Sequence, residues 1–153
     1  MRKTQKFKYT DLINAGIGVP DSLDSALADC TSKVETARTV CEWVASTIED
    51  GESVIVITHV LSNRRGTCLG KCAIAVSLLR KLGFDKEEVF VTVLVKKGEN
   101  PFEALHALVY LQSKEIFFDL TDGFHEYDKT LEDVSFTSMV VLMFNDENCM
   151  VPY

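Results

Sequence analysis

Hydrophobic residues recur at helical spacing in two long segments of the chain. From residue 32 to about residue 50, apolar side chains recur every three or four positions and define one buried face. Ser32 and Glu35 fit the S-x-x-E capping box at the start of this segment, and Gly51 is typical of a helix end. Residues 67–82 are apolar on nearly all faces, which predicts a central, buried helix that Gly83 ends.

The period of the hydrophobic pattern changes to two after Gly83. Four segments then read as strands, at residues 88–96, 105–112, 114–121 and 138–144. A short helical segment at 21–30 precedes the long helices, and the apolar segment 53–61 fits either a strand or a packed connector. Helices first and strands after predict an α+β fold, in which N-terminal helices and the central buried helix pack on an antiparallel sheet.

The length of 153 residues corresponds to one domain. Gly16, Gly18 and Pro20 mark residues 1–20 as an N-terminal arm or irregular lead-in, and residues 21–153 are expected to form a single domain. A hydrophobic content of 46% with 25% charged residues excludes a largely disordered chain. A chain of this length buries a core without metal or disulfide staples.

Charge and cysteine content narrow the possible partners and the compartment. The formal net charge of −7 repels phosphate, which argues against nucleic acid and against an anionic membrane surface as partners. No apolar stretch reaches the ~20 residues of a membrane helix, and no apolar run follows the basic first ten residues as it would in a secretory signal. Five cysteines, an odd number, then favour reduced thiols and a cytoplasmic location.

Cys68 stands at the predicted start of the buried helix. Thr67 is a favourable N-cap, so Cys68 falls in the first turn, where free amides and the helix dipole stabilise an anion. A thiol at this position is expected to have a lowered pKa, and Gly66 before it permits a close approach.

A histidine and an aspartate meet across the second and third predicted strands. With a two-residue loop at 112–113, His106 lies directly opposite Asp119, with Cβ atoms ~5 Å apart. A loop longer by two residues puts Thr121 opposite His106 and leaves Asp119 within reach as a diagonal neighbour. Together with Cys68, the pair supplies a thiol nucleophile, a base and a group that orients the base.

Simpler interpretations exist for each of these residues. A lone cysteine is often just buried, a strand histidine is often structural, and Asp119 can bond its own turn. Asp122 is a rival to Asp119 as the orienting acid. Trp43 and Asn63 are candidates for a second oxyanion donor beside the Cys68 backbone amide.

A zinc site is a further alternative interpretation of the same region. Cys68 and Cys72 could bind zinc together with a histidine from His59, His106 or His125, but zinc-binding pairs usually come as C-x2-C on a turn. His59 in the apolar connector is expected to be structural, and His125 to be exposed in a loop. We therefore expect neither a metal nor a cofactor.

The sequence resembles the transglutaminase-like superfamily. In that family a G-x-C motif opens a buried helix ending in L-R-x-L-G, and strands bearing H-A-x-x-x-L and F-D-x-T follow. The matching segments here are Gly66 to Cys68, Leu79 to Gly83, His106 to Leu111 and Phe118 to Thr121. The resemblance covers roughly residues 34–123, with Cys, His and Asp in the family's order.

The resemblance implies a papain-like α+β core with Cys68 as nucleophile, His106 as base and Asp119 as its orienter. It also implies thiol-dependent acyl transfer or amide hydrolysis of the cysteine protease, deamidase or transglutaminase type, through a thioester, on a peptide or protein amide. Two departures stand out. Many members carry an acidic residue where this chain has Gly70, and an aromatic residue where it has Leu108.

Two alternatives follow from the same residues. The sequence from Arg65 to Cys68, and the 38 positions from Cys68 to His106, also resemble arylamine N-acetyltransferases, which are longer chains with a further domain. The other alternative is a catalytically silent transglutaminase-like domain that only binds its partner.

Overall fold

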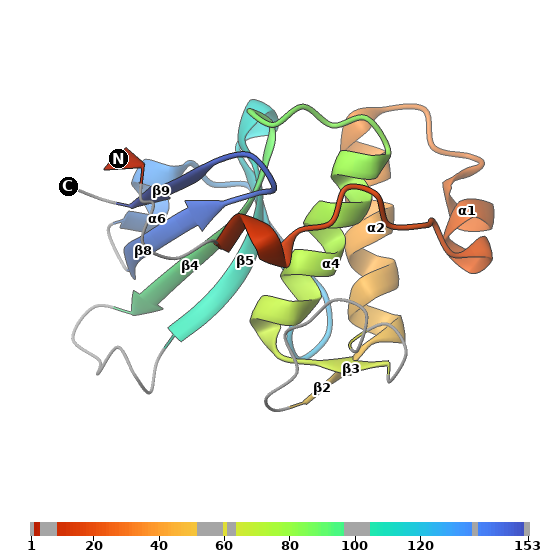
Figure 1. The fold of residues 1–153 in the computed structure, drawn as a ribbon, viewed down its shortest axis with the longest axis horizontal. Coiled ribbons are helices and arrows are strands. Elements are labelled where there is room, and N and C mark those ends of the chain that lie inside the picture. Colours follow the sequence, from red (N-terminus) through yellow and green to blue (C-terminus); the bar gives the residue numbers. More distant parts are fainter. Residues whose placement is uncertain are drawn as a thin grey trace.

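A seven-stranded antiparallel sheet and a layer of helices on one of its faces make up the structure (Figure 1). The computed structural model describes residues 2–3, 9–51, 60, 64–96, 105–135 and 138–151. Helix α4 packs directly on the sheet at β4 and β5, α2 packs on α4, and α1 packs on α2. The predicted α+β class is confirmed.

Most of the described helical residues come before the long strands. They are α1 (Asp21–Leu27), α2 (Lys33–Thr47), α4 (Cys68–Lys81) and the later α6 (Leu131–Ser135), with 3-10 turns η1 (Tyr9–Leu12) and η2 (Gln112–Lys114). The described end of the predicted lead-in packs on the rest of the protein. Ile13 and Ile17 are buried in the main core, and the Asn14 N–H donates to Ser77 Oγ at 2.9 Å.

The large sheet has the strand order β1-β9-β8-β4-β5-β6-β7, and every neighbouring pair is antiparallel. Its strands are β1 (Arg2–Lys3), β4 (Val89–Lys96), β5 (Leu105–Leu111), β6 (Ile116–Asp119), β7 (His125–Tyr127), β8 (Ser138–Phe144) and β9 (Cys149–Val151). Two further strands, β2 (Glu49–Asp50) and β3 (Arg65–Gly66), form a separate parallel pair. The predicted segment 53–61 lies outside the described residues, apart from Val60.

Helix α2 begins as predicted but ends earlier. Ser32 Oγ accepts the Glu35 N–H at 3.1 Å, which is half of the capping box. The Glu35 carboxylate accepts the Thr31 N–H at 2.8 Å, so the second half reaches one residue further back than expected. The helix ends at Thr47 rather than near Gly51, because Glu49 and Asp50 turn out to pair with β3.

Helix α4 is the buried centre of the molecule. It runs as predicted from its N-cap Thr67, and Gly83 stops it with φ at +99°. Its residues 72–76 are fully buried between α2 and the sheet. The helix is thus fixed on both sides, which gives its first residue, Cys68, a defined place.

Truncating a side chain in this helix should be costly. Ile74 is fully buried, so Ile74→Ala should lower the free energy of unfolding by about 2–5 kcal/mol through lost burial and the cavity left behind. Urea unfolding followed by circular dichroism measures the change. Met139→Ala, at a side chain that is 53% exposed, should stay within about 0.5 kcal/mol of the wild type. Equal losses in both variants would contradict the central role of α4.

The hairpin that joins β5 and β6 has a loop two residues longer than the simplest prediction, which changes the strand register. Leu111 lies opposite Ile116, and Val109 opposite Phe118. The loop therefore has four residues, 112–115, formed by η2 and by Glu115 in the left-handed region at φ +56°. The prediction that His106 lies directly opposite Asp119 was wrong, and the alternative with the longer loop is the one observed.

Within the described ranges, we find no helix that combines the length and the apolar character needed to cross a membrane.

Candidate active site

Cys68 begins helix α4 beside the first residues of β5. The Thr67 hydroxyl accepts the Gly70 N–H at 3.1 Å and caps the helix. The Cys68 side chain is partly exposed, and its sulfur is hydrogen-bonded to the His106 ring and to the backbone N–H of Ala107. The start of α4, which carries Cys68, and the start of β5 thus meet at one solvent-accessible point.

His106 and Asp119 are joined by a short hydrogen bond. His106 Nε2 lies 2.9 Å from Asp119 Oδ2, while Asp119 Oδ1 accepts the Thr121 N–H at 3.0 Å. The histidine side chain remains 32% exposed and the aspartate side chain 18% exposed. Although β5 and β6 are two residues out of the simple register, Asp119 reaches the ring as a diagonal neighbour. The structure therefore brings all three predicted site residues together.

The surroundings of the Cys68 sulfur favour the thiolate. Burial acts to raise the pKa of this thiol, but the hydrogen bond from His106, the Ala107 amide and the charge of His106 outweigh it. The pKa of Cys68 is therefore lowered below its ordinary value. This is the direction that a reactive cysteine requires.

His106 favours the protonated ring. Its pKa is raised to about 10, first by the hydrogen bond to Asp119 and then by the one to Cys68, against the opposing effect of burial. Burial acts to raise the pKa of Asp119, yet His106 and the Thr121 amide lower it below the ordinary value. The pKa of His106 is thus raised while those of Cys68 and Asp119 are lowered, so each shift favours the charged form of its group.

The buried cysteines lie in a different environment. All five cysteines are free, and burial raises the pKa of Cys41, Cys72 and Cys149. Cys72, which the zinc alternative would use, is fully buried in the main core one turn after Cys68. Across the described part of the chain, no three His, Cys, Asp or Glu side chains are gathered where they could hold a metal ion.

The rival and accessory candidates lie elsewhere. Asp122 has its backbone N–H bonded to Asp50, and it is Asp119 that bonds the histidine. Trp43 Nε1 donates to Ser22 Oγ at 3.0 Å, so this indole is already engaged away from Cys68. His125 is exposed as predicted, but it lies on strand β7 rather than in a loop. His59 and Asn63 lie outside the described residues.

The two departures from the family pattern are accommodated in the interior. Gly70 is buried in the first turn of α4, where its N–H bonds the capping Thr67. Leu108 is buried in a second cluster with Phe90 and Phe117. That cluster lies on the sheet face away from α4, because alternate residues of β4 and β5 enter the two clusters. Leu108 therefore packs away from the helix that carries Cys68.

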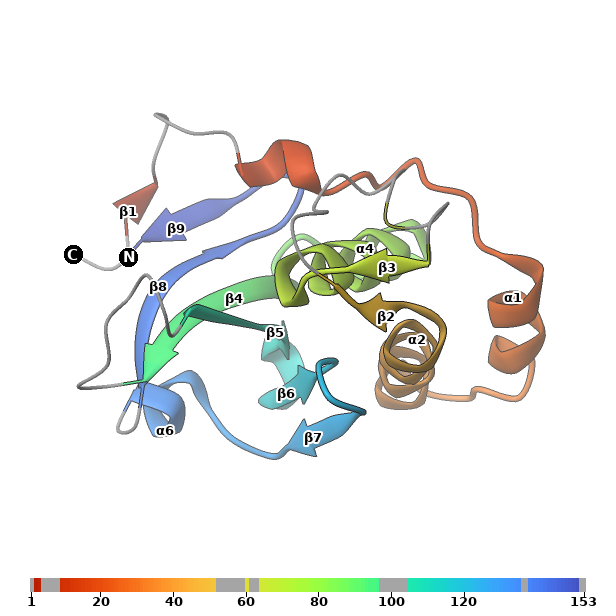
Figure 2. The same ribbon diagram turned by 90° about the horizontal axis from the view of Figure 1, so that it is seen from below.

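An ion pair between a buried lysine and an exposed aspartate lies beside the site and was not predicted from the sequence. Lys71, in the first turn of α4, is 2% exposed, and its Nζ lies 2.9 Å from Asp50 Oδ1. Figure 2 shows β2, which carries Asp50, at the end of the helical layer where α2 finishes and α4 begins. The only indication of this ion pair in the sequence is a lysine within a helix that is otherwise apolar on most faces.

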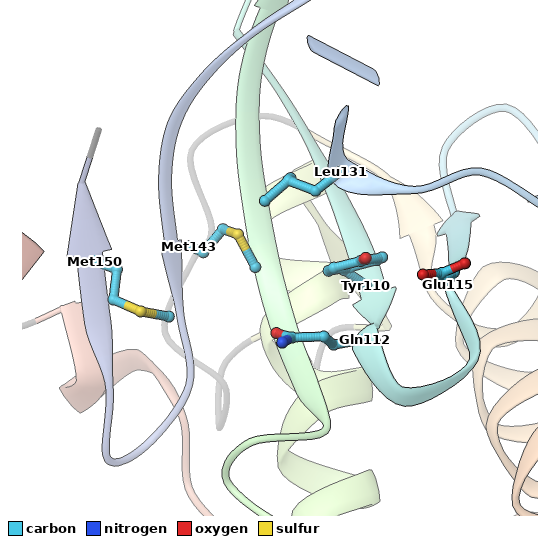
Figure 3. Close-up of a pocket in the computed structure, with 6 residues that line it drawn as sticks. All are labelled: Tyr110, Gln112, Glu115, Leu131, Met143 and Met150. Carbon is cyan, nitrogen blue, oxygen red and sulfur yellow. The ribbon is translucent and has the colours of Figure 1, made fainter. Parts of the chain in front are cut away.

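A separate hollow of about 410 Å³ lies on the far face of the sheet (Figure 3). Tyr110 in its wall stacks on Phe117 with ring centroids 4.2 Å apart. Its lining residues are Tyr110, Gln112, Glu115, Leu131, Met143 and Met150. This hollow shares no residue with the Cys68 site.

Comparisons with known proteins agree with this architecture. No protein-family model matches the sequence, and no curated protein does. An EGTA-treated structure of LapG from Legionella pneumophila is similar, with a TM-score of 0.59 and 14% identity over 86% of this chain and 73% of that one. A further LapG structure has a TM-score of 0.52 and 12% identity over 91% of this chain and 88% of that one. These similarities show that the chain shares the fold of LapG, which is the transglutaminase-like fold expected from the sequence.

Proposed function

We propose that this chain is a thiol-dependent enzyme that hydrolyses or transfers the acyl group of a peptide or protein amide, as a cysteine protease does. The observation that carries the proposal is the contact of the Cys68 sulfur with a histidine that Asp119 holds at 2.9 Å. The lowered pKa of Cys68 supports it, because the thiolate is the nucleophilic form. The transglutaminase-like fold supports it as well.

The proposed reaction proceeds through a thioester. The Cys68 thiolate attacks the amide carbonyl carbon, and the Cys68 backbone N–H at the start of α4 stabilises the resulting oxyanion. The imidazolium of His106 gives its proton to the amine, the C–N bond breaks, and a thioester remains on Cys68. His106, now neutral, removes a proton from water or from an acceptor amine, which attacks the thioester and releases Cys68 as thiolate.

Asp119 fixes which nitrogen of His106 takes part. Because Nε2 is bonded to the Asp119 carboxylate, the other ring nitrogen, Nδ1, is left to exchange a proton with the sulfur and the leaving amine. The carboxylate also stabilises the imidazolium that the first step uses. Asp119 therefore acts through His106, whereas Cys68 and His106 meet the reacting atoms.

The five free thiols support a reducing compartment such as the cytoplasm.

Two labelling experiments test the proposal: alkylation of the Cys68 thiol and trapping of an acyl group on it. Brief treatment of the wild type with iodoacetamide at neutral pH should modify Cys68 faster than Cys30 and Cys149, as peptide mapping by mass spectrometry would show. An activated thioester of an N-blocked peptide should leave its acyl group on Cys68. Cys68→Ala should lose both signals and remain folded. If Cys68 in the wild type reacts no faster than Cys30, the mechanism is wrong.

A further inference from the structure

Lys71 is a buried cation one turn after the proposed nucleophile. It lies three residues beyond Cys68 on α4, and its backbone N–H is bonded to the carbonyl of the capping Thr67. Its side chain is 2% exposed, and its ammonium lies 2.9 Å from Asp50 Oδ1. Because an unpaired ammonium is costly to bury, this contact fixes Asp50 against the first turn of α4.

Asp50 is held at the same place through its backbone. It pairs with Gly66 in the parallel β2–β3 bridge, and the Gly51 N–H donates to the Gly66 carbonyl at 2.9 Å. Gly66 comes two residues before Cys68. The Asp50 carboxylate is therefore anchored both to the strand that leads into α4 and to the first turn of the helix.

The second oxygen of Asp50 reaches the turn that follows Asp119. Its Oδ2 accepts the Asp122 N–H at 3.0 Å, across 72 positions of sequence. Asp122 is in the left-handed region at φ +54°, which aspartate tolerates better than most residues other than glycine, and Gly123 follows at +96°. The carboxylate of Asp119 bonds the neighbouring Thr121 N–H, so Asp50 and Asp119 hold adjacent amides of one turn.

We propose that Lys71 and Asp50 are positioning residues, which clamp the turn after Asp119 to the start of α4 and so hold the Asp119–His106 pair against Cys68. This inference rests on the proposed function. Both oxygens of Asp50 accept hydrogen bonds, one from the helix that carries Cys68 and one from the turn that follows Asp119. Neither Lys71 nor Asp50 takes part in bond making, since each acts through backbone and ring placement.

The direction in which the pKa of Cys68 changes when Asp50 is substituted distinguishes a positioning role of Asp50 from a direct effect of its charge. Removing the negative charge of Asp50 would, through space alone, stabilise the nearby thiolate and lower the pKa of Cys68. Loosening the turn would instead weaken the hold of His106 on the sulfur and raise that pKa. His106 from β5 is the charged group that acts on this sulfur. Asp119 on β6 lies behind that ring at 2.9 Å, and Lys71 is the charged residue of the same first turn of α4.

Asp50→Asn tests the clamp because an amide has a single acceptor oxygen. It must therefore give up either the Lys71 or the Asp122 contact. We expect the pH midpoint of Cys68 alkylation by iodoacetamide to rise by about half a unit or more, which is a roughly threefold slower reaction on the acid side of the profile. A midpoint that is unchanged or lowered would overturn the proposal.

Asp146→Asn is the matched control at the other end of α4. Asp146, like Asp50, uses both of its oxygens and accepts from a cation of α4, here Arg80 at 2.6 and 3.2 Å. This variant should lose stability in a thermal melt and keep the wild-type midpoint of Cys68 alkylation. If its midpoint rose as much as that of Asp50→Asn, the effect would be a general loosening of α4, and the proposal would fail.

A double variant covers the case in which the single one does not fold. Lys71→Met combined with Asp50→Ala removes both charges, so no unpaired ion is buried, and it also removes the acceptor for Asp122. The expected rise in the midpoint is the same, and its absence counts against the clamp. A wild type whose Cys68 reacts no faster than Cys30 would remove the proposed function and the clamp together. A reactive wild type with an unchanged double variant removes the clamp alone.

Discussion

A His106→Ala variant should lose about 10²–10⁴-fold of the wild-type rate of amide turnover, the range that a general acid–base residue ordinarily supplies. His106 has two tasks in the proposed mechanism, because it holds the Cys68 sulfur as thiolate and protonates the leaving amine. Both tasks need the ring within hydrogen-bonding reach of the sulfur, where the structure has it. Alanine removes both at once, and because the His106 side chain is only partly buried, at 32% exposed, a thermal melt should be run beside the rate measurement to check that the variant is folded.

The same variant should move the pH profile of Cys68 alkylation to higher pH. In the wild type the pKa of Cys68 is lowered and that of His106 is raised to about 10, so the thiolate–imidazolium pair exists between these two values. Alkylation should therefore rise as the pH passes the lowered pKa of Cys68. Without the ring, burial of the sulfur, which acts to raise its pKa, is opposed mainly by backbone amides.

Second-order rate constants for iodoacetamide across the pH range measure this shift, with Cys68 followed by peptide mapping. His125→Ala is the matched control, because His125 is exposed on β7 opposite Asp119, and its charge acts on Asp119 but is not among the groups that act on the Cys68 sulfur. It should keep the wild-type midpoint and the wild-type turnover. An unchanged midpoint in His106→Ala would mean that the ring does not hold the thiolate.

Helix α4 was predictable because its signals are local. Thr67 as N-cap, an apolar surface on most faces and Gly83 as a stop all lie within the helix or next to it, and the observed bounds agree with them. The same locality placed Cys68 in the first turn. The end of α2 was misjudged for the opposite reason, since the pairing of Glu49 and Asp50 with β3 depends on residues well beyond the helix.

The hairpin that carries His106 and Asp119 shows a different limit. A four-residue loop with Glu115 in the left-handed region sets the β5–β6 register, and nothing in the residue type of a glutamate announces this conformation. The pairing of His106 with Asp119 survived the error because a shift of two residues keeps the side chains on the same face. A shift of one would have separated them.

The contact of Lys71 with Asp50 was beyond sequence reasoning. The two residues are 21 positions apart, and Asp50 reaches Asp122 across a further 72. No period or motif links such positions, because the contacts exist only once α2, α4 and the β6–β7 turn have packed. The sequence thus predicted three residues that the fold brings together, while the contacts that we propose to hold them in place required the structure.

Asp119→Asn should lower amide turnover strongly while Cys68 and His106 remain in place. The corresponding substitution in the serine triad costs up to ~10⁴-fold, because an amide no longer selects the productive tautomer of the histidine. Here the Asp119 carboxylate is the largest cause of the raised pKa of His106, so its loss should lower that pKa. The imidazolium that protonates the leaving amine is then lost at lower pH than in the wild type.

The alkaline limb of the pH–rate profile reports this directly. In the wild type it falls as His106 loses its proton near its pKa of about 10, and in Asp119→Asn the fall should begin at lower pH. Asp122→Asn, the same change three residues along, should keep the wild-type limb, because the structure records only the backbone of Asp122 in the network. A shifted limb in Asp122→Asn and not in Asp119→Asn would make Asp122 the orienting acid. Asparagine tolerates the left-handed backbone of position 122, so lost folding would not explain that result.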